Sequence, residues 1–250
     1  GWRYNWNEWP DNSVCQWAAI GMIPAAQAPW NCVIPEWVRQ LNNAWLRFSY
    51  NPNYQWFGYT DSNPGNNNAQ ATRPSGMVQM VMSVDNYKND SRWIGCENWF
   101  ANSSNWEWFI NCRSYYAWYA FVKAMRLSRT ENLSSGFNWF RGPNGIAQKL
   151  VSELESDGTW IEHSQTTHPG WYGNTFVTSW AVIMLTPTLF VLPPVADAGR
   201  DIVWTYDRPL TFDASGSYHL DTTKRIVLYQ WDFDGNGTYD YSGTSPIATW

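Results

Sequence analysis

The chain has 250 residues, of which 44% are hydrophobic and only 15% charged, and its net charge is −5. This length allows one large domain or two moderate ones with a substantial core. Because the Lys and Arg residues are scattered singly, no basic stripe is available for phosphates, which argues against nucleic acid or an anionic membrane surface as partner. Tryptophan is unusually frequent, with 20 residues. We expect most of these rings in the core and the others in contact with ligands or chains.

Residues 1 to about 190 are predicted to form helical hairpins. Their apolar periodicity predicts helices at 13–27, 35–49, 74–84, 91–101, 110–127, 142–156 and 175–186. Asn12 or Ser13 is the expected N-cap of the first helix, and Pro35 stands near the start of the second. The first, third, fifth and seventh helices carry few charges, whereas the others are more polar. An α/α toroid needs this alternation, because its inner helices contact neighbours on all sides and its outer helices have one wet face.

The most apolar stretch of the chain is residues 176–192, which Pro187 interrupts. Its length is about the minimum for a membrane span. We therefore predict a buried helix followed by an extended segment, and no membrane span in this stretch.

Two stretches carry a more specific pattern. Residues 1–22, GWRYNWNEWPDNSVCQWAAIGM, combine a Gly-Trp-Arg-Tyr turn with an Asp-x-Ser-Val-x-x-Trp helix start, and residues 156–185 contain a second turn and helix entry of this kind. Both resemble the repeat of bacterial proteins related to prenyltransferases and squalene cyclases. The resemblance implies an α/α toroid over residues 1–190. The family's ring uses about twice as many hairpins, so we expect this stretch to hold only its C-terminal part.

After residues 191–196, which we interpret as a linker, the sequence alternates as strands do. Ala198–Gly199, Leu210–Ser217 (LTFDASGS) and Tyr229–Gly235 (YQWDFDG) resemble the start of a polycystic-kidney-disease (PKD) domain. This resemblance implies an immunoglobulin-like β-sandwich, of which residues 197–250 would be the N-terminal part. The expected fold class is therefore multidomain, with a mainly α toroid followed by a β-sandwich, both incomplete.

The catalytic patterns of the toroid family are missing from this sequence. No DxDD motif and no zinc-binding Asp-x-Cys occur, and Trp99 stands where a thioester domain needs a Gln after Cys96. We therefore lean against an enzyme. A toroid-fold enzyme, either terpenoid cyclase-like or polysaccharide lyase-like, is kept as an alternative, with Asp11, Asp157 or His163 as its acid or base.

The leading hypothesis is a structural or interaction protein. PKD domains in large surface proteins resemble spacers and adhesion modules, which favours an exported prokaryotic protein at the cell surface. We expect a non-catalytic scaffold in a larger assembly, with other protein chains, a homopolymer among them, or glycans as partners. A pure glycan-binding module is a further alternative. The predicted contact residues are tryptophans near the family's turns: Trp2, Trp6, Trp9, Trp160 and Trp171.

Calcium is the one cofactor that the sequence suggests. Asp232, Asp234 and Asn236 supply oxygen ligands at positions 1, 3 and 5 of a calcium loop, followed by Gly237 for the turn. Asp240 at position 9 could contribute, although position 12 lacks the usual Glu. In PKD domains this stretch is usually a strand end and hairpin, which is the competing interpretation.

Four Asn-x-Ser/Thr sequons would accept glycans if the chain is exported: Asn89, Asn102, Asn132 and Asn236. The four cysteines include no CxxC pair and permit two disulfides. In the toroid that the resemblance implies, Cys32 and Cys96 would lie near the same rim of adjacent repeats, which makes Cys32–Cys96 the more plausible bridge. Pairing of Cys15 with Cys112, or pairing within each hairpin, stays open.

Overall fold

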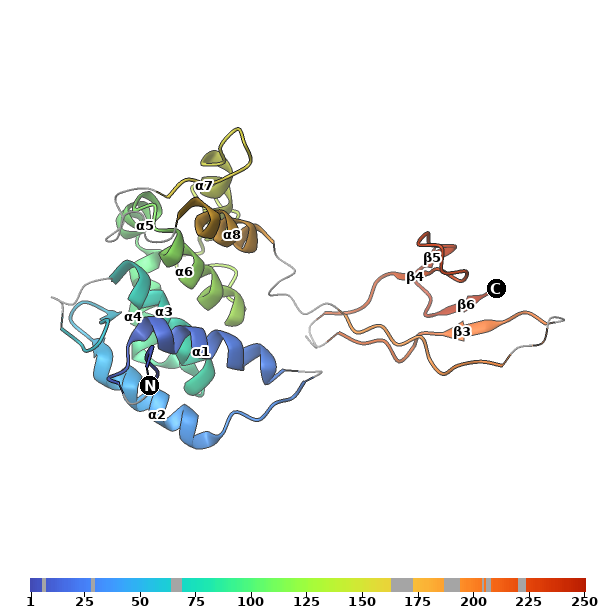
Figure 1. Ribbon diagram of the computed structural model, residues 1–250, viewed down its shortest axis with the longest axis horizontal. Coiled ribbons are helices and arrows are strands. Elements are labelled where there is room, and N and C mark those ends of the chain that lie inside the picture. Colours follow the sequence, from blue (N-terminus) through green and yellow to red (C-terminus); the bar gives the residue numbers. More distant parts are fainter. Residues whose placement is uncertain are drawn as a thin grey trace. The chain divides into compact units, whose positions relative to one another are not determined.

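The computed structural model describes residues 1–5, 8–27, 30–63, 69–162, 173–186, 194–203, 205, 208–219 and 224–250. Its contacts divide the chain into two compact units, Gly1–Phe190 and Val191–Trp250. The described part of the first unit is mainly helical, and that of the second contains short strands (Figure 1). The fold is therefore mainly α with a few small antiparallel sheets, as the sequence pattern predicts.

Most predicted helices form close to their expected positions. The observed elements of the first unit are α1 (Asn12–Ala25), α2 (Glu36–Ser49), β1 (Tyr50–Asn51), β2 (Trp56–Phe57), α3 (Ala69–Ser83), η1 (Tyr87–Asn89), α4 (Ser91–Ala101), α5 (Ser103–Asn111), α6 (Tyr115–Leu127), α7 (Ile146–Ser152) and α8 (Gly173–Leu185). The expected cap of α1 was wrong. Asp11, rather than Asn12 or Ser13, caps the helix, and its carboxylate accepts the backbone N–H of Val14.

Three helices differ from their predicted bounds. The helix expected at 110–127 begins only at Tyr115, because Arg113 adopts a positive φ of 51° and Ser114 caps α6; the helix before it, α5, was not predicted. Helix α3 begins before the predicted position, with Pro74 inside it. Helix α7 is shorter than expected and begins only after Gly145.

Helix α3 lies at the centre of the first unit. It packs against α1, α2, α4 and α6, while α6 also packs against α8, and α8 against α7. The helices α1, α3, α6 and α8 thus contact one another in sequence, as Figure 1 shows. A close approach depends on Gly76 of α3, because a side chain there would overlap the buried ring of Phe57.

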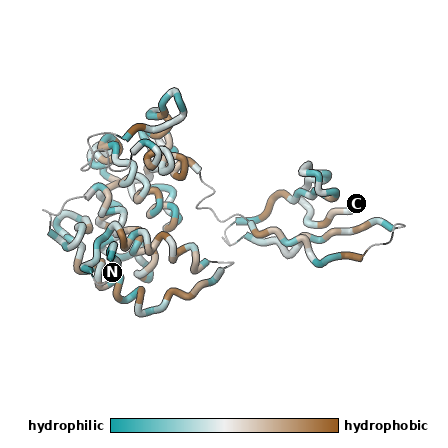
Figure 2. The backbone as a smooth tube through the Cα atoms, in the orientation of Figure 1, coloured by the Kyte–Doolittle hydropathy of each residue, from teal (hydrophilic) through white to brown (hydrophobic). Residues whose placement is uncertain are grey.

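Hydrophobic and hydrophilic residues alternate along the helices of this unit, which gives the repeated change between brown and teal in Figure 2. This is the pattern of helices that bury one face. No helix in the described part of the chain combines the length and the apolar character that crossing a membrane requires.

The second unit contains two antiparallel strand pairs. Strand β3 (Thr211–Asp213) pairs with β6 (Ile247–Thr249), and β4 (Tyr229–Trp231) pairs with β5 (Tyr241–Gly243). Four rings pack together beside these strands, with centroids between 4.8 and 5.9 Å apart: Phe212, Trp231, Phe233 and Trp250. These rings are only partly buried, and Trp250 is 55% exposed.

A buried guanidinium ties α3 to the hairpin before it. Arg73 lies with its Cζ 3.7 Å from the ring centroid of Trp99 and donates to the carbonyls of Tyr54 and Gln55. Burial lowers the pKa of Arg73 to about 10, so the side chain stays charged at neutral pH. The flat cation thus joins three segments by stacking and by hydrogen bonds.

Arg73→Lys should lower the free energy of unfolding by about 2 kcal/mol, because an ammonium cannot stack flat on Trp99 while reaching both carbonyls. Urea unfolding followed by tryptophan fluorescence measures this difference. Arg47→Lys, at an exposed position of α2, is the matched control and should leave stability unchanged. Equal stability of both variants would contradict the role of Arg73.

Candidate interaction sites

Asp11, one of the predicted catalytic residues, is fully buried. Its Oδ1 accepts from the N–H of Val14 and the hydroxyl of Ser13, and its Oδ2 lies 3.3 Å from Nε of Arg3. The carboxylate therefore caps α1 and pairs with Arg3 of the opening turn. These contacts give Asp11 a structural role at the start of α1.

Asp157, the second candidate acid, lies on the surface. The hydroxyl of Thr159 donates to its carboxylate, and so does the backbone N–H of Thr159; these hydrogen bonds lower the pKa of Asp157. An exposed carboxyl group that ionises readily is a poor general acid at neutral pH. The third candidate, His163, lies outside the described residues.

Asp11→Ala should destabilise the protein by about 2 kcal/mol, because it removes the cap of α1 and the buried carboxylate beside Arg3. Asp157→Ala should leave stability nearly unchanged. Thermal and urea unfolding of the two variants, beside the wild type, test this contrast. An Asp11→Ala variant as stable as the wild type would show that the residue is not structural and would revive the catalytic hypothesis.

The tryptophans predicted as contact residues differ in exposure. Trp160 is buried, and its indole N–H donates to the carbonyl of Leu150, so its ring is part of the core. Trp2 packs partly buried against the same core. Trp9 is 63% exposed and rests edge-on against Phe48, so it alone of these three offers an open ring. Trp6 and Trp171 lie outside the described residues.

A larger aromatic surface, which the sequence prediction missed, is formed by α1, α6 and α8. We call it the aromatic face; its members are Trp17, Tyr116, Tyr119, Phe176 and Trp180. Tyr119 stacks between Trp17 at 5.5 Å and Trp180 at 6.1 Å. Phe176 and Tyr116 contact Trp180 at 6.0 and 5.7 Å. The five rings therefore form one continuous array.

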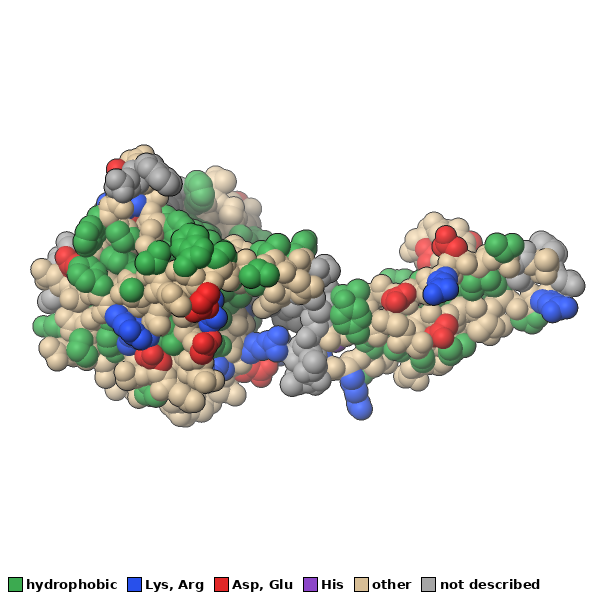
Figure 3. All heavy atoms as spheres, turned by 90° about the horizontal axis from the view of Figure 1, so that it is seen from below, with side chains coloured by type: hydrophobic (Ala, Val, Ile, Leu, Met, Phe, Trp, Pro, Cys, Tyr) green, Lys and Arg blue, Asp and Glu red, His purple; other side chains and the backbone are tan. Residues whose placement is uncertain are grey.

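The aromatic face reaches solvent at its two ends. Trp17 is 41% and Phe176 60% exposed, whereas Tyr119 and Trp180 between them are buried. Figure 3 displays one side of the helical unit, on which hydrophobic side chains gather in patches beside a few charged ones. Exposed rings continuous with a buried aromatic array are candidates for a contact surface.

A single lysine lies beside the aromatic face. The ammonium of Lys123 is 5.2 Å from the ring centroid of Tyr119, one helical turn away on α6. Burial lowers the pKa of Lys123 to about 8, so it is partly neutral at slightly alkaline pH. The face thus combines a large apolar area with one weakly hydrated cation.

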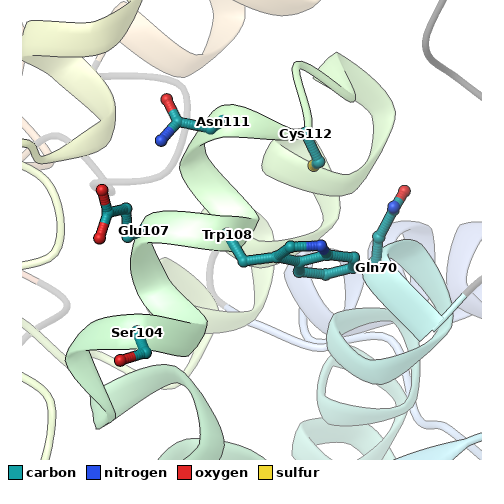
Figure 4. A pocket seen from close by; sticks show the side chains of 6 residues that line it. All are labelled: Gln70, Ser104, Glu107, Trp108, Asn111 and Cys112. Atoms are coloured by element: carbon teal, nitrogen blue, oxygen red, sulfur yellow. The ribbon is translucent and has the colours of Figure 1, made fainter.

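A second candidate site is a shallow pocket of about 490 Å³ beside α5. It is lined by Gln70, Ser104, Glu107, Trp108, Asn111 and Cys112. Figure 4 shows Trp108 extending from α5 toward Gln70 of α3, with Cys112 nearby, and Ser104, Glu107 and Asn111 along the other side of α5. The pocket combines an indole with several uncharged hydrogen-bonding groups.

The predicted calcium ligands come together in the second unit. Carboxylate oxygens of Asp232, Asp234 and Asp240 lie within 4.8 Å of one another. The N–H groups of Gly237, Asn236 and Gly235 donate to Asp232 and lower its pKa. The loop turns at Gly237, whose φ of 89° favours glycine. Carboxylate oxygens are ligands that a hard cation such as calcium accepts.

The predicted disulfide is not formed. All four cysteines carry free thiols; Cys32 is exposed, whereas Cys96 is buried within α4 and donates to the carbonyl of Gln55. Burial raises the pKa of the Cys96 thiol to about 12, so it stays protonated. The two cysteines therefore lie in different environments in this structure, and the Cys32–Cys96 pairing stays a prediction.

All four sequons lie on the surface: Asn89, Asn102, Asn132 and Asn236 are exposed. The side-chain oxygen of Asn102 caps α5 by accepting the N–H groups of Ser104 and Asn105. The amide of Asn236 donates to Asp234 inside the acidic loop. Two of the four acceptor side chains thus already serve local structure.

Comparison with known proteins gives no match to a protein family and no significant similarity to a curated protein or to a solved structure.

Proposed function

We propose that this chain is a non-catalytic scaffold of an exported, prokaryotic cell-surface assembly, and that it contacts other protein chains through the aromatic face. The observation that carries the proposal is the continuous array of five rings on three helices, open at Trp17 and Phe176. Large exposed rings normally mark protein contacts, and burying them supplies most of the binding energy.

The packing order of the helices supports the toroid interpretation of the first unit. The helices α1, α3, α6 and α8, which carry few charges, contact one another in sequence, and the more polar α2, α4 and α7 pack against members of this row. Inner and outer helices of a toroid would have these contacts. We propose that this unit is the C-terminal part of a prenyltransferase-like α/α toroid.

The strand pairs support the PKD interpretation of the second unit. Two antiparallel pairs pack beside four aromatic rings, as the inner faces of a sandwich would. The segments that resemble a PKD domain include β3 and β4. We propose a PKD-like immunoglobulin fold, and with it export and glycosylation at the exposed sequons.

The structural roles of Asp11 and Asp157 favour a scaffold over the enzyme alternative. Asp11 pairs with Arg3 and caps α1, whereas Asp157 is an exposed turn residue. Neither carboxyl group is held against the aromatic face. The face can therefore bind an apolar partner, but these acids cannot supply a proton to it.

Replacing both open rings of the aromatic face should abolish self-association. We expect the wild type to form oligomers as its concentration rises, and the Trp17→Ser/Phe176→Ser variant to sediment as a monomer. Trp37→Ser removes a ring on α2 that is 64% exposed and should leave association unchanged. Sedimentation velocity gives the masses, and circular dichroism confirms that each variant is folded. A wild type that stays monomeric at all concentrations would contradict the assembly.

We also propose that the acidic loop binds calcium. The expected affinity is that of extracellular modules, with a Kd of about 10⁻⁴–10⁻³ M, because no bidentate Glu completes the site. Asp234→Asn should abolish the binding heat in calorimetry, whereas Asp201→Asn, an exposed carboxylate elsewhere in this unit, should not. Absence of binding heat in the wild type would exclude calcium from the loop.

A further inference from the structure

Trp108 forms an unusually well-supported aromatic platform. Its indole is 49% exposed, and it rests edge-on against Trp99 at 5.9 Å with an interplanar angle of 89°. Trp99 in turn stacks on the buried guanidinium of Arg73. Because two rings and a cation support one another, the open indole is held in place before any ligand arrives.

The groups around this platform are hydrogen-bonding and almost uncharged. Gln70 comes from α3, and Ser104, Glu107 and Asn111 follow the 3.6-residue period of α5. The amides can both donate and accept, the hydroxyl can do either, and the carboxylate of Glu107 accepts. The residues that line the described pocket include neither Lys nor Arg, but the ammonium of Lys149 lies 3.5 Å from Oδ1 of Asn111, behind the side of the pocket that carries Glu107.

We propose that this pocket binds a neutral glycan, with one sugar ring stacked on the exposed face of Trp108 and its hydroxyls bonded to Gln70. A sugar ring has an apolar C–H face and a rim of hydroxyls, which matches an indole with an amide beside it. The volume of about 490 Å³ falls in the range of small-ligand sites. With this site, the proposed scaffold protein binds glycans in addition to other protein chains.

The same residues exclude other ligands and reactions. A metal ion would find only one carboxylate in the pocket, that of Glu107. The thiol of Cys112 donates to the carbonyl of Phe109, and burial raises the pKa of Cys112 to about 11, so it is not a thiolate nucleophile. Binding without chemistry is the role that this set of side chains supports.

The pocket shares no residue with the aromatic face, so it can be tested independently of the proposed assembly. Ser104 belongs to the Asn102 sequon, and the protein should therefore be produced without glycosylation. The probes are neutral pentasaccharides of cellulose, amylose, chitin and mannan, with oligogalacturonate as the acidic probe. Isothermal calorimetry and the quenching of tryptophan fluorescence give the affinities.

We expect at least one neutral pentasaccharide to bind with a micromolar to millimolar Kd, and oligogalacturonate not to bind. Trp108→Ala should weaken this binding about tenfold or more, and Trp108→Phe should weaken it less. Trp37→Ala, at an exposed position of α2, should bind as the wild type does. Gln70→Ala should also weaken binding while leaving the platform intact.

Three results would overturn the proposal: no neutral probe binding, binding of the acidic probe alone, or unchanged affinity in a folded Trp108→Ala variant. Should Trp108→Ala fail to fold, Gln70→Ala and Trp108→Phe decide the question, because both keep the packing on Trp99. If the protein is monomeric but binds a neutral glycan, the result supports the glycan site and contradicts only the proposed assembly.

Discussion

One buried amide holds the first three helices together. Asn12 opens α1, and its side-chain oxygen accepts the indole N–H of Trp45 in α2 at 3.0 Å and the amide of Gln79 in α3 at 2.9 Å. Its own amide donates to the carbonyl of Gly58. Because an unpaired buried amide is costly, these partners fix α1, α2 and the turn at Gly58 against the central helix. Helices α4 and α6 then pack on α3, and α8 packs on α6.

The sequence predicted the helices well where local signals agree, and poorly where a break depends on the surroundings. Helices α2 and α4 match their expected bounds because Pro35 and Asp90 mark their starts. Helix α5 was missed and α6 was predicted to start too early, because Arg113 gives no sign in the sequence of its positive φ. Burial of Ile110 and Tyr115 on either side favours two helices over one continuous rod.

The candidate sites were harder to predict than the helices, because exposure of an aromatic ring is a tertiary property. Trp180 is buried and Trp17 is not, although both stand in the same helix-start pattern. Trp108 belongs to no sequence motif. Its exposure depends on how α5 orients the ring, which rests edge-on against Trp99. Sequence can count such rings, but only packing decides which of them meet solvent. The acidic loop was predictable, since its ligands are local in sequence.

The aromatic face and the pocket at Trp108 differ in the groups that surround their rings. This difference favours a different class of ligand at each surface. At the aromatic face the neighbours are further rings and the half-buried cation of Lys123, so a partner gains chiefly by removing apolar area from water. At the pocket the neighbours of Trp108 are amides, a hydroxyl and a carboxylate, so a partner must replace their water with its own hydrogen bonds. A protein segment suits the first environment and a neutral sugar the second. A chain with few charges but many Asn, Ser and Trp residues can build both without relying on salt-sensitive ion pairs.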